Sequence, residues 1–332
     1  MNIYYLGLKK KLVSNNNYFK KIIVLEGGDK NDICFENIYK QKLDYNDLKN
    51  FKTISKFYDK IINKIKKEDN DCCFMLYNQA SIEFMKNTDK IICTNNIDLV
   101  KTLNNKPKCR EFLTSETNCL KYKYFKAKDI SFEKMQTAFG NSCDKFVVQQ
   151  PSGFAGYGTH LLDKSNSILK NLNHKITYSV SSYVDNSISL NNTFMISNNY
   201  IHIFEGSYQN IKVGKELNYD GWDFDTYKSL DNKLKKLINN TTINIAKKLQ
   251  CAGYRGICGV DYILKDDNLY FMEINPRFQA SSEHLDKLLI QKGLPSLFEL
   301  NYMAFYNEAE FKKNVIKIKE CKWKNLINKR LI

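Results

Sequence analysis

The sequence predicts an α/β protein whose C-terminal two thirds have α+β character, and three observations support this fold class. Within residues 1–98, short apolar runs alternate with a long helical pattern, which is typical of parallel sheet units. Residues 176–205 instead contain consecutive strand patterns with no helical pattern between them. Farther on, an amphipathic helix at residues 230–249 precedes two strands joined by a tight turn.

The N-terminal region contains three apolar runs that we interpret as buried strands, at residues 20–28, 71–78 and 89–95. A helical pattern at residues 46–68 separates the first two of these strands. The apolar positions of this helix are Leu48, Phe51, Ile54, Tyr58, Ile61, Ile62 and Ile65. We therefore expect a small α/β domain over residues 1–98. It has no GxGxxG sequence, so nothing predicts a dinucleotide site there.

The middle of the chain is predicted to be helical from residue 97 to about residue 124, with Pro107 in the first turn of a second helix. Strands at residues 144–150 and 159–163 then enclose a glycine-rich loop, which predicts a hairpin. The segment Ser207–Asp225 is rich in polar and aromatic residues, and we expect a long loop that contributes to substrate contacts.

Composition limits the class of protein. The 332 residues are 43% hydrophobic and 13% aromatic, which is a globular composition. No run of about 18 apolar residues occurs, so no membrane span is expected. The N-terminal segment is too short and too rich in tyrosine for a signal peptide. Ten cysteines without a CxxC pair, with only four histidines, favour reduced thiols and a cytoplasmic location over disulfides or a zinc site.

The formal net charge of +15 has two interpretations. A nucleic-acid binder would concentrate its basic residues in a stripe, whereas the lysines here are spread along the whole chain. The densest runs are Lys121–Lys128 and Lys317–Arg330. Nucleic acid is therefore a disfavoured partner, and a general attraction for small anions such as nucleotides is the simpler inference.

Three polar side chains leave an apolar strand at every second position: Glu273, Asn275 and Arg277. Alternate residues of a strand share one face, so a carboxylate, an amide and a guanidinium should project together. Pro276 suggests that regular pairing ends there. Carboxylate and amide oxygens suit Mg²⁺, and a guanidinium suits phosphate. The alternative is a solvated edge face with a charge pair.

The same register places Phe271 on the face of these polar side chains and Met272 and Ile274 on the other. The strand at residues 257–264 should pair antiparallel with it across a turn at residues 265–268, which brings Asp261 beside Glu273.

Two carboxylates about 4 Å apart repel by about 4 kcal/mol at an effective dielectric constant of about 20, and a bound cation would offset this repulsion. Mg²⁺ takes only one or two protein carboxylates and completes its coordination with phosphate and water. The pair of Asp261 and Glu273 therefore predicts a metal-bound polyphosphate. The alternative is two exposed acids on a surface hairpin.

Two further features carry the chemistry of phosphate binding. Gly153, Gly156 and Gly158 follow a strand, and the backbone N–H groups of such a loop can wrap phosphate oxygens. Lys106 and Arg110 lie near a helix start. Taken singly, each has a simpler explanation, as an ordinary hairpin turn or as solvated surface charge.

In their order along residues 97–300, these features resemble the ATP-grasp superfamily. The sequences "GYRGICGVDYI" and "FMEINPRFQ" are similar to those of biotin carboxylase, carbamoyl phosphate synthetase and related carboxylate–amine ligases. The resemblance implies a pre-ATP-grasp domain at residues 1–98 and a two-lobed ATP-grasp fold, with a small lobe at 99–180 and a large lobe at 181–332.

The resemblance also implies roles for individual residues. Asp261, Glu273 and Asn275 would hold Mg²⁺, or Mn²⁺ in its place, and Arg277 would contact the transferring phosphate. Lys106 would lie near the ATP phosphates. The lid over the triphosphate and the linker that meets adenine would be formed by Gly153, Gly156, Gly158, Ser182, Tyr183 and Val184.

The chain departs from the family pattern at two places. A lysine often ends the strand before the glycine loop, and Gln149 and Gln150 stand there instead. Gln150 is the candidate to hydrogen-bond phosphate or adenine without a charge. The linker lacks the family's frequent glutamate, and Asp185 is the candidate to take its place.

The function implied is ATP-dependent carboxylate–amine ligation through an acyl phosphate, with release of ADP and phosphate. The partners would be a small-molecule carboxylate and an amine, and a homodimer is compatible with this interpretation. One alternative is a nucleotide-binding regulatory protein with little turnover, which the missing lysine suggests. The other is a nucleic-acid-associated factor, which the charge suggests.

Overall fold

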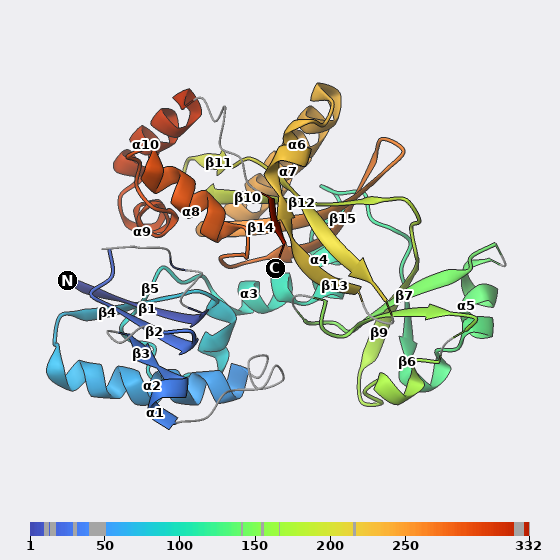
Figure 1. The fold of residues 1–332 in the computed structure, drawn as a ribbon, viewed down its shortest axis with the longest axis horizontal. Coiled ribbons are helices and arrows are strands. Elements are labelled where there is room, and N and C mark those ends of the chain that lie inside the picture. Colours follow the sequence, from blue (N-terminus) through green and yellow to red (C-terminus); the bar gives the residue numbers. More distant parts are fainter. Residues whose placement is uncertain are drawn as a thin grey trace.

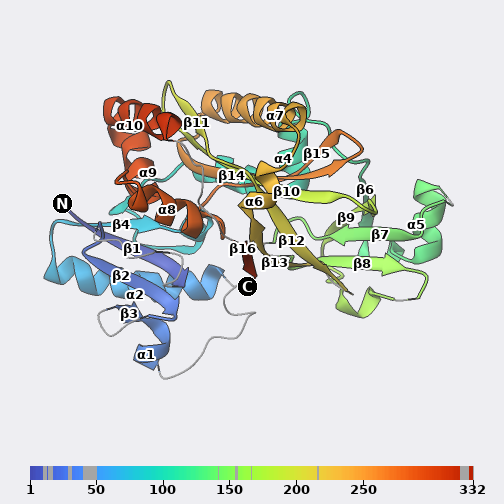
Figure 2. The same ribbon diagram turned by 45° about the horizontal axis from the view of Figure 1, so that its top comes forward.

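The computed structural model describes residues 1–9, 13, 18–28, 32–39, 51–140, 142–153, 156–165, 167–214, 217–321 and 329–331. In this part of the chain the strands form three sheets. In Figure 1 the N-terminal sheet lies at the lower left, the large sheet lies above it, and the small sheet lies at the right. Figure 2 shows the same three parts with the helices α7 and α10 at the top.

The N-terminal sheet is parallel, in the order β3-β2-β1-β4-β5. Its strands are β1 Asn2–Lys9, β2 Lys21–Glu26, β3 Ile33–Cys34, β4 Cys72–Leu76 and β5 Ile91–Ile92. The predicted strands at 20–28, 71–78 and 89–95 are thus confirmed as β2, β4 and β5. The central strand β1 was not predicted. It is buried on both faces, but its apolar run is interrupted by Gly7 and leads directly into a run of lysines.

Helices close both faces of this sheet. On one face, α2 (Phe51–Glu68) buries its apolar stripe, including Ile54, Ile61 and Ile62, as the periodicity predicts. The predicted start of this helix, residues 46–50, lies outside the described residues. The other face packs on C-terminal helices, and the rings of Tyr5 and Phe298 meet edge to face at 5.5 Å. The N-terminal domain is therefore joined to the large sheet by a shared apolar core.

Two short helices, α3 (Ile97–Asn104) and α4 (Lys106–Phe112), follow that domain. Asn96 and Asn105 cap them through side-chain oxygens, and Pro107 lies in the first turn of α4 as predicted. The predicted helical segment, which reached about residue 124, was too long. Thr114 and Thr117 hydrogen-bond their hydroxyl groups back to carbonyl groups four residues earlier, which competes with helix continuation.

The small sheet is antiparallel, in the order β6-β9-β7-β8. Its strands are β6 Lys123–Lys126, β7 Lys145–Gln149, β8 Thr159–Asp163 and β9 Thr177–Ser182. Helix α5 (Phe132–Phe139) covers one face and buries Phe132 and Met135 against Phe146 and Val148. The predicted hairpin is formed by β7 and β8, and the glycine-rich loop is at its tip.

The large sheet has the order β15-β14-β10-β12-β13-β16, and β11 also pairs with β10. Its strands are β10 Ile188–Ile196, β11 Ile201–Ile203, β12 Ser207–Val213, β13 Leu217–Asp223, β14 Gly256–Lys265, β15 Asn268–Asn275 and β16 Lys329–Leu331. The loop expected at Ser207–Asp225 was wrong, because β12 and β13 form a hairpin there. Its tyrosine, isoleucine, valine and tryptophan residues favour strands, although polar residues alternate with them in both strands.

Helices also cover the large sheet. One core buries side chains of α3, α4 and α7 against β10, β14 and β15, including Leu103, Cys109, Ile245 and Val260. The helices not yet given are α1 Phe35–Tyr39, α6 Phe224–Lys228, α7 Asn232–Cys251, α8 Ser282–Gln291, α9 Leu297–Tyr306 and α10 Glu308–Glu320. The described 3₁₀ helices are η3 Gln79–Phe84, η4 Ala127–Asp129 and η5 Leu169–Asn171. Among the described helices, none combines the length and the apolar character that a membrane crossing requires.

Candidate active site

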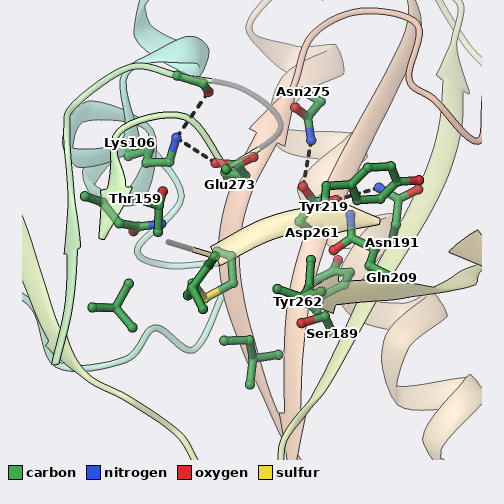
Figure 3. A pocket seen from close by; sticks show the side chains of 18 of the residues that line it. Lys106, Thr159, Ser189, Asn191, Gln209, Tyr219, Asp261, Tyr262, Glu273 and Asn275 are labelled. Atoms are coloured by element: carbon green, nitrogen blue, oxygen red, sulfur yellow. Dashed lines mark hydrogen bonds and ion pairs between the residues drawn. The ribbon is translucent and has the colours of Figure 1, made fainter. Parts of the chain in front are cut away.

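A cavity of about 440 Å³ lies where the three sheets meet, and it collects most of the residues singled out in the sequence. Its walls come from Leu8 and Tyr77 of the N-terminal domain, from β7, β9 and the glycine-rich loop, and from β10, β12, β13, β14 and β15 of the large sheet. Figure 3 shows its polar end, where Lys106, Glu273, Asp261 and Asn275 lie together.

The two carboxylates lie opposite each other on the β14–β15 hairpin, with Asp261 paired to Glu273 as predicted. One detail of the register was wrong. A β-bulge leaves Met272 without a partner, because Tyr262 pairs with Phe271. An extra residue in one strand reverses the alternation beyond it. Met272 therefore lines the cavity with Glu273, while Phe271 is buried in the core with Ile274.

Asp261 is held by three amide groups. Its Oδ1 accepts hydrogen bonds from Asn191 Nδ2 at 2.6 Å and Gln209 Nε2 at 3.0 Å, and its Oδ2 accepts one from Asn275 Nδ2 at 2.9 Å. Burial and the neighbouring charge of Glu273 nevertheless raise the pKa of Asp261 to about 7. Its anionic form therefore lacks a positive partner that would compensate for burial.

Glu273 has the opposite environment. Lys106 Nζ lies 2.8 Å from Glu273 Oε2, and both side chains are largely buried. Burial acts to raise the pKa of Glu273, but the Lys106 ammonium outweighs it and the net effect lowers that pKa. Lys106 is fixed because its backbone N–H donates to Pro151 O at 2.8 Å, which ties the start of α4 to the glycine-rich loop.

Arg277 lies just beyond the end of β15 and lines the same cavity. Its Nη2 donates to Asn275 Oδ1 at 2.7 Å, and its Nη1 donates to Phe278 O at 3.1 Å. These two hydrogen bonds are to neutral oxygens, while the charge of the guanidinium works against the effect of burial and acts to lower the pKa of the nearby carboxylates of Asp261 and Glu273.

This donor set fits a hard divalent cation. It offers two carboxylates, together with the Asn275 amide oxygen that Arg277 now contacts, and a cation there would offset both the burial and the Glu273 charge that raise the pKa of Asp261. No group of three or more His, Cys, Asp or Glu residues that could hold a metal occurs in the described chain. A cation held by the two carboxylates would complete its coordination with water and phosphate oxygens.

The glycine-rich loop contributes Gly153 and Gly156 to the cavity lining. Gly156 has φ +82°, and a Cβ there would lie 2.0 Å from Leu217 O of β13, so any side chain would separate the loop from the large sheet. Gly158, with φ +70°, packs on the side chain of Gln150 instead. Neither Gly158 nor Gln150 lines the cavity. Phe154 and Ala155 of the predicted lid lie outside the described residues.

The segment that follows β9 lines the cavity through Ser182, Tyr183 and Val184. The backbone N–H of Tyr183 donates to Lys145 O at 2.9 Å, so that donor is already used by the sheet. Asp185 does not line the cavity. It is exposed and lies 4.0 Å from the Lys145 ammonium.

Arg110, one helical turn after Lys106, is buried behind the small-sheet wall. Its Nη2 donates to Gln149 Oε1 at 3.0 Å and its Nη1 donates to Ser179 Oγ at 3.3 Å. The guanidinium also lies 3.5 Å from the centroid of the Tyr122 ring. A guanidinium can only donate, so the bond fixes the orientation of the Gln149 amide. Gln149, and not Gln150, lines the cavity.

Sequence reasoning missed Asn191, Gln209 and the Arg110–Gln149 pair as parts of this site. Signals for two of them were present. Asn191 and Asn192 interrupt the apolar run of β10, where a buried amide needs a partner. Arg110 is four residues after Lys106 and so lies on the same helix face. Arg255, in the sequence "GYRG", does not line the cavity and donates to the carbonyl groups of Gln250 and Tyr254.

The sequence profile of the ATP-grasp domain matches residues 78–281, which is more than half of the chain. The chain belongs to the ATP-grasp family. The matched segment includes the carboxylate hairpin, Lys106, the glycine-rich loop and the linker after β9. No curated protein is similar enough in sequence to be matched.

Solved structures with this ATP-grasp fold are similar in shape but distant in sequence. The L-amino acid ligase of Bacillus licheniformis matches with a TM-score of 0.62 and 10% identity over 92% of this chain and 74% of the other. N5-carboxyaminoimidazole synthetase of Staphylococcus aureus, solved with ADP, matches with a TM-score of 0.55 and 15% identity, over 92% of this chain and 78% of the other. The N5-carboxyaminoimidazole ribonucleotide synthetase of Thermotoga maritima matches with a TM-score of 0.56 and 16% identity, over 92% of this chain and 75% of the other. These likenesses confirm the predicted fold, an α/β domain followed by ATP-grasp.

Proposed function

We propose that the protein is an ATP-dependent carboxylate–amine ligase that forms an amide or peptide bond through an acyl phosphate and releases ADP and phosphate. The observation that carries this proposal is the polar end of the main cavity. Two carboxylates, Asp261 and Glu273, lie opposite each other there, and two cationic side chains, Lys106 and Arg277, line the same space. This arrangement suits a metal-bound triphosphate whose terminal group is transferred.

The nucleotide would extend from the polar end toward the small sheet. Its base would lie near Ser182, Tyr183 and Val184, and the glycine-rich loop would cover its phosphates. The Gln149 amide, held by Arg110, would present its Nε2 donor to the nucleotide. The ADP that accompanies the Staphylococcus aureus relative supports a nucleotide in this fold.

Asp261, Glu273 and Asn275 would hold Mg²⁺, with Mn²⁺ as a substitute. When bound, the ion neutralises phosphate charge. Lys106 would release part of its interaction with Glu273 and contact the phosphates, and Arg277 would turn from Asn275 toward the γ-phosphate. The reaction needs no nucleophilic side chain, because the chain's residues position the reactants and stabilise charge.

Two transfers would then occur in the cavity. A carboxylate oxygen of the substrate attacks the γ-phosphorus, and the bond from that phosphorus to the β–γ bridging oxygen breaks, which gives an acyl phosphate and ADP. The amine nitrogen then attacks the acyl carbon, the carbon–oxygen bond to phosphate breaks, and the amine loses a proton to solvent. The L-amino acid ligase among the similar structures is consistent with chemistry of this class in the fold.

The proposal is tested by measuring the nucleotide products formed with a panel of small carboxylates and amines. We expect ADP and phosphate, formed only when an accepted acid is present. Hydroxylamine in place of the amine should yield a hydroxamate. AMP and pyrophosphate tied to amide formation would overturn the acyl phosphate and leave the ATP site standing. Binding of Mg²⁺–ATP without turnover for any pair in the panel would favour the regulatory alternative.

A further inference from the structure

A second cavity, of about 190 Å³, lies behind the candidate active site and shares no lining residue with it. It is enclosed by β11, residues 204–206, and helices α6, α7, α8 and α10. The two cavities adjoin along the chain, because Gly206 lines the second and Ser207 lines the first. Nothing in the ligase reaction proposed above uses this second space.

Two buried imidazoles line the second cavity with unpaired ring nitrogens. His202 is 4% exposed, and neither of its nitrogens has a hydrogen-bond partner among the described residues. His284 is 5% exposed, and its Nε2 likewise has no partner within the described chain. Its ring packs on those of Trp222 and Phe224, at 4.5 and 4.8 Å. A buried polar atom without a partner costs about 1–3 kcal/mol, so a polar group that hydrogen-bonds these nitrogens would be stabilised here.

The cavity is also positively charged. Lys228, Lys235 and Lys319 line it, against the single carboxylate of Glu205. Burial raises the pKa of Glu205, which favours its neutral form. Lys228 lies 3.5 Å from Asp225, which offsets part of one charge.

The imidazoles add no positive charge at neutral pH. The pKa of His202 is lowered to about 3, first by burial and then by the charge of Lys319. The pKa of His284 is lowered to about 4, first by burial and then by the charge of Lys228. Asp225 and Glu283 also face His284, and they raise its pKa only in part. The cavity thus combines a positive electrostatic potential with neutral hydrogen-bonding groups.

We propose that this second cavity binds a small oxyanion, a carboxylate or a phosphate, whose oxygens accept hydrogen bonds from His202 and His284 and are neutralised by the surrounding lysines. An oxyanion supplies the missing acceptors and reduces the repulsion among the ammonium groups. A metal ion does not fit, because the lysines repel it and the described residues offer no group of three ligands. A purely apolar ligand would leave the ring nitrogens unpaired.

The four histidines of the chain provide a direct test by nitrogen NMR of the imidazole rings. Inorganic phosphate and succinate are titrated separately into the full-length protein, and the signals are assigned with His202→Gln and His284→Gln. We expect saturable shifts at His202 and His284, while the exposed His174 shows only a small linear drift. Saturation with phosphate alone, or with succinate alone, identifies which oxyanion the site prefers.

A pair of lysine variants on helix α10 separates a site from general charge. Both Lys317 and Lys319 are exposed, but only Lys319 lines the cavity, so Lys317→Gln is the matched control for Lys319→Gln. We expect Lys319→Gln to weaken oxyanion binding by about fivefold and Lys317→Gln to leave it unchanged. The proposal would be overturned if the NMR shifts of His202 and His284 saturated no more than the shift of His174. It would also be overturned if both lysine variants weakened oxyanion binding equally. The test does not depend on ATP turnover.

Discussion

The two walls of the main cavity are built in different ways. The wall that carries Asp261 and Glu273 is one hairpin, so its carboxylates are placed by strand pairing between neighbouring segments. The opposite wall gathers Arg110, Gln149 and Ser179, whose contacts join segments 39 and 69 residues apart. The first wall concentrates negative charge for a cation, and the second buries a cation behind neutral amide and hydroxyl groups. The comparison shows that the charged groups of a site can come from one short segment of sequence, whereas the wall that shapes the site needs contacts between distant segments.

The largest expected effect comes from neutralising the hairpin wall. Asp261→Asn or Glu273→Gln should lower ATP turnover by at least about 100-fold, equivalent to about 3 kcal/mol of transition-state stabilisation, because the cation loses a ligand. The fold should be retained in Asp261→Asn, since one of two repelling carboxylates is removed. Glu273→Gln also leaves the buried Lys106 ammonium without its ion pair, so its melting temperature should fall. Steady-state kinetics and thermal melting of each variant measure the two effects.

Asp266→Asn in the turn of the same hairpin is the matched control. Asp266 is exposed, and its φ of +47° is tolerated by asparagine. Near-normal turnover in both Asp261→Asn and Glu273→Gln would contradict the metal assignment.

Arg277→Lys comes next, and it tests whether planar geometry matters as well as charge. A lysine keeps the charge but cannot make the paired contacts of a guanidinium to phosphate, so we expect kcat to fall by about 30-fold with a smaller change in the KM for ATP. Rapid-quench measurement of the first turnover locates the loss. A lysine variant with wild-type kcat would show that Arg277 supplies only charge.

Gln149→Glu changes the second wall without removing atoms. One carboxylate oxygen would still accept from Arg110, now as an ion pair, so the melting temperature should stay the same or rise. The other oxygen would replace the Nε2 donor and repel nucleotide phosphates, weakening ATP binding by about tenfold.

Gln150→Glu is the matched control for this change, because Gln150 packs on Gly158 outside the cavity lining. Isothermal titration with ATP compares the two variants. A purely structural role for Gln149 predicts unchanged affinity, and equal losses in both variants would show only a general charge effect.

Gly156→Ala tests the contact between the glycine-rich loop and the large sheet. A Cβ would meet Leu217 O, and the positive φ adds backbone strain of about 1 kcal/mol. We expect the KM for ATP to rise by about threefold to fivefold. Gly140→Ala shares the positive φ, at +108°, but its Cβ would meet nothing within 4 Å. If both variants raise KM equally, the effect comes from backbone strain and not from the loop contact.

The smallest effect is expected at Asp185. Its side chain is exposed and lies 4.0 Å from Lys145, and a surface pair of this kind contributes less than about 1 kcal/mol. Asp185→Asn should therefore change the KM for ATP by less than about twofold. A tenfold increase would instead support the adenine or ribose contact that the family resemblance suggests.

The sequence alone determined the carboxylate hairpin, because strand pairing across a short turn follows from local alternation and turn residues. It also determined the helix-start lysine and the glycine-rich loop as components, together with the α/β fold class. It could not place Phe271 and Met272 correctly, since a bulge depends on how two strands twist together. It also missed β1, whose apolar run is interrupted by Gly7 and leads directly into a run of lysines.

The tertiary structure decided which of these components meet. It brought Lys106 to Glu273, placed three amides around Asp261, and put Arg110 behind Gln149. Apart from the contact of Asn275 with Asp261, which lies within the hairpin, none of these contacts follows from spacing, because each joins elements whose relative position is set by packing of the whole core. Burial acts to raise the pKa of both carboxylates of the hairpin, but the charge of Lys106 beside Glu273 turns the net shift of that residue downward, opposite to the shift of Asp261. Residue types are written in the sequence, whereas their electrostatic environment arises only where distant segments exclude water together.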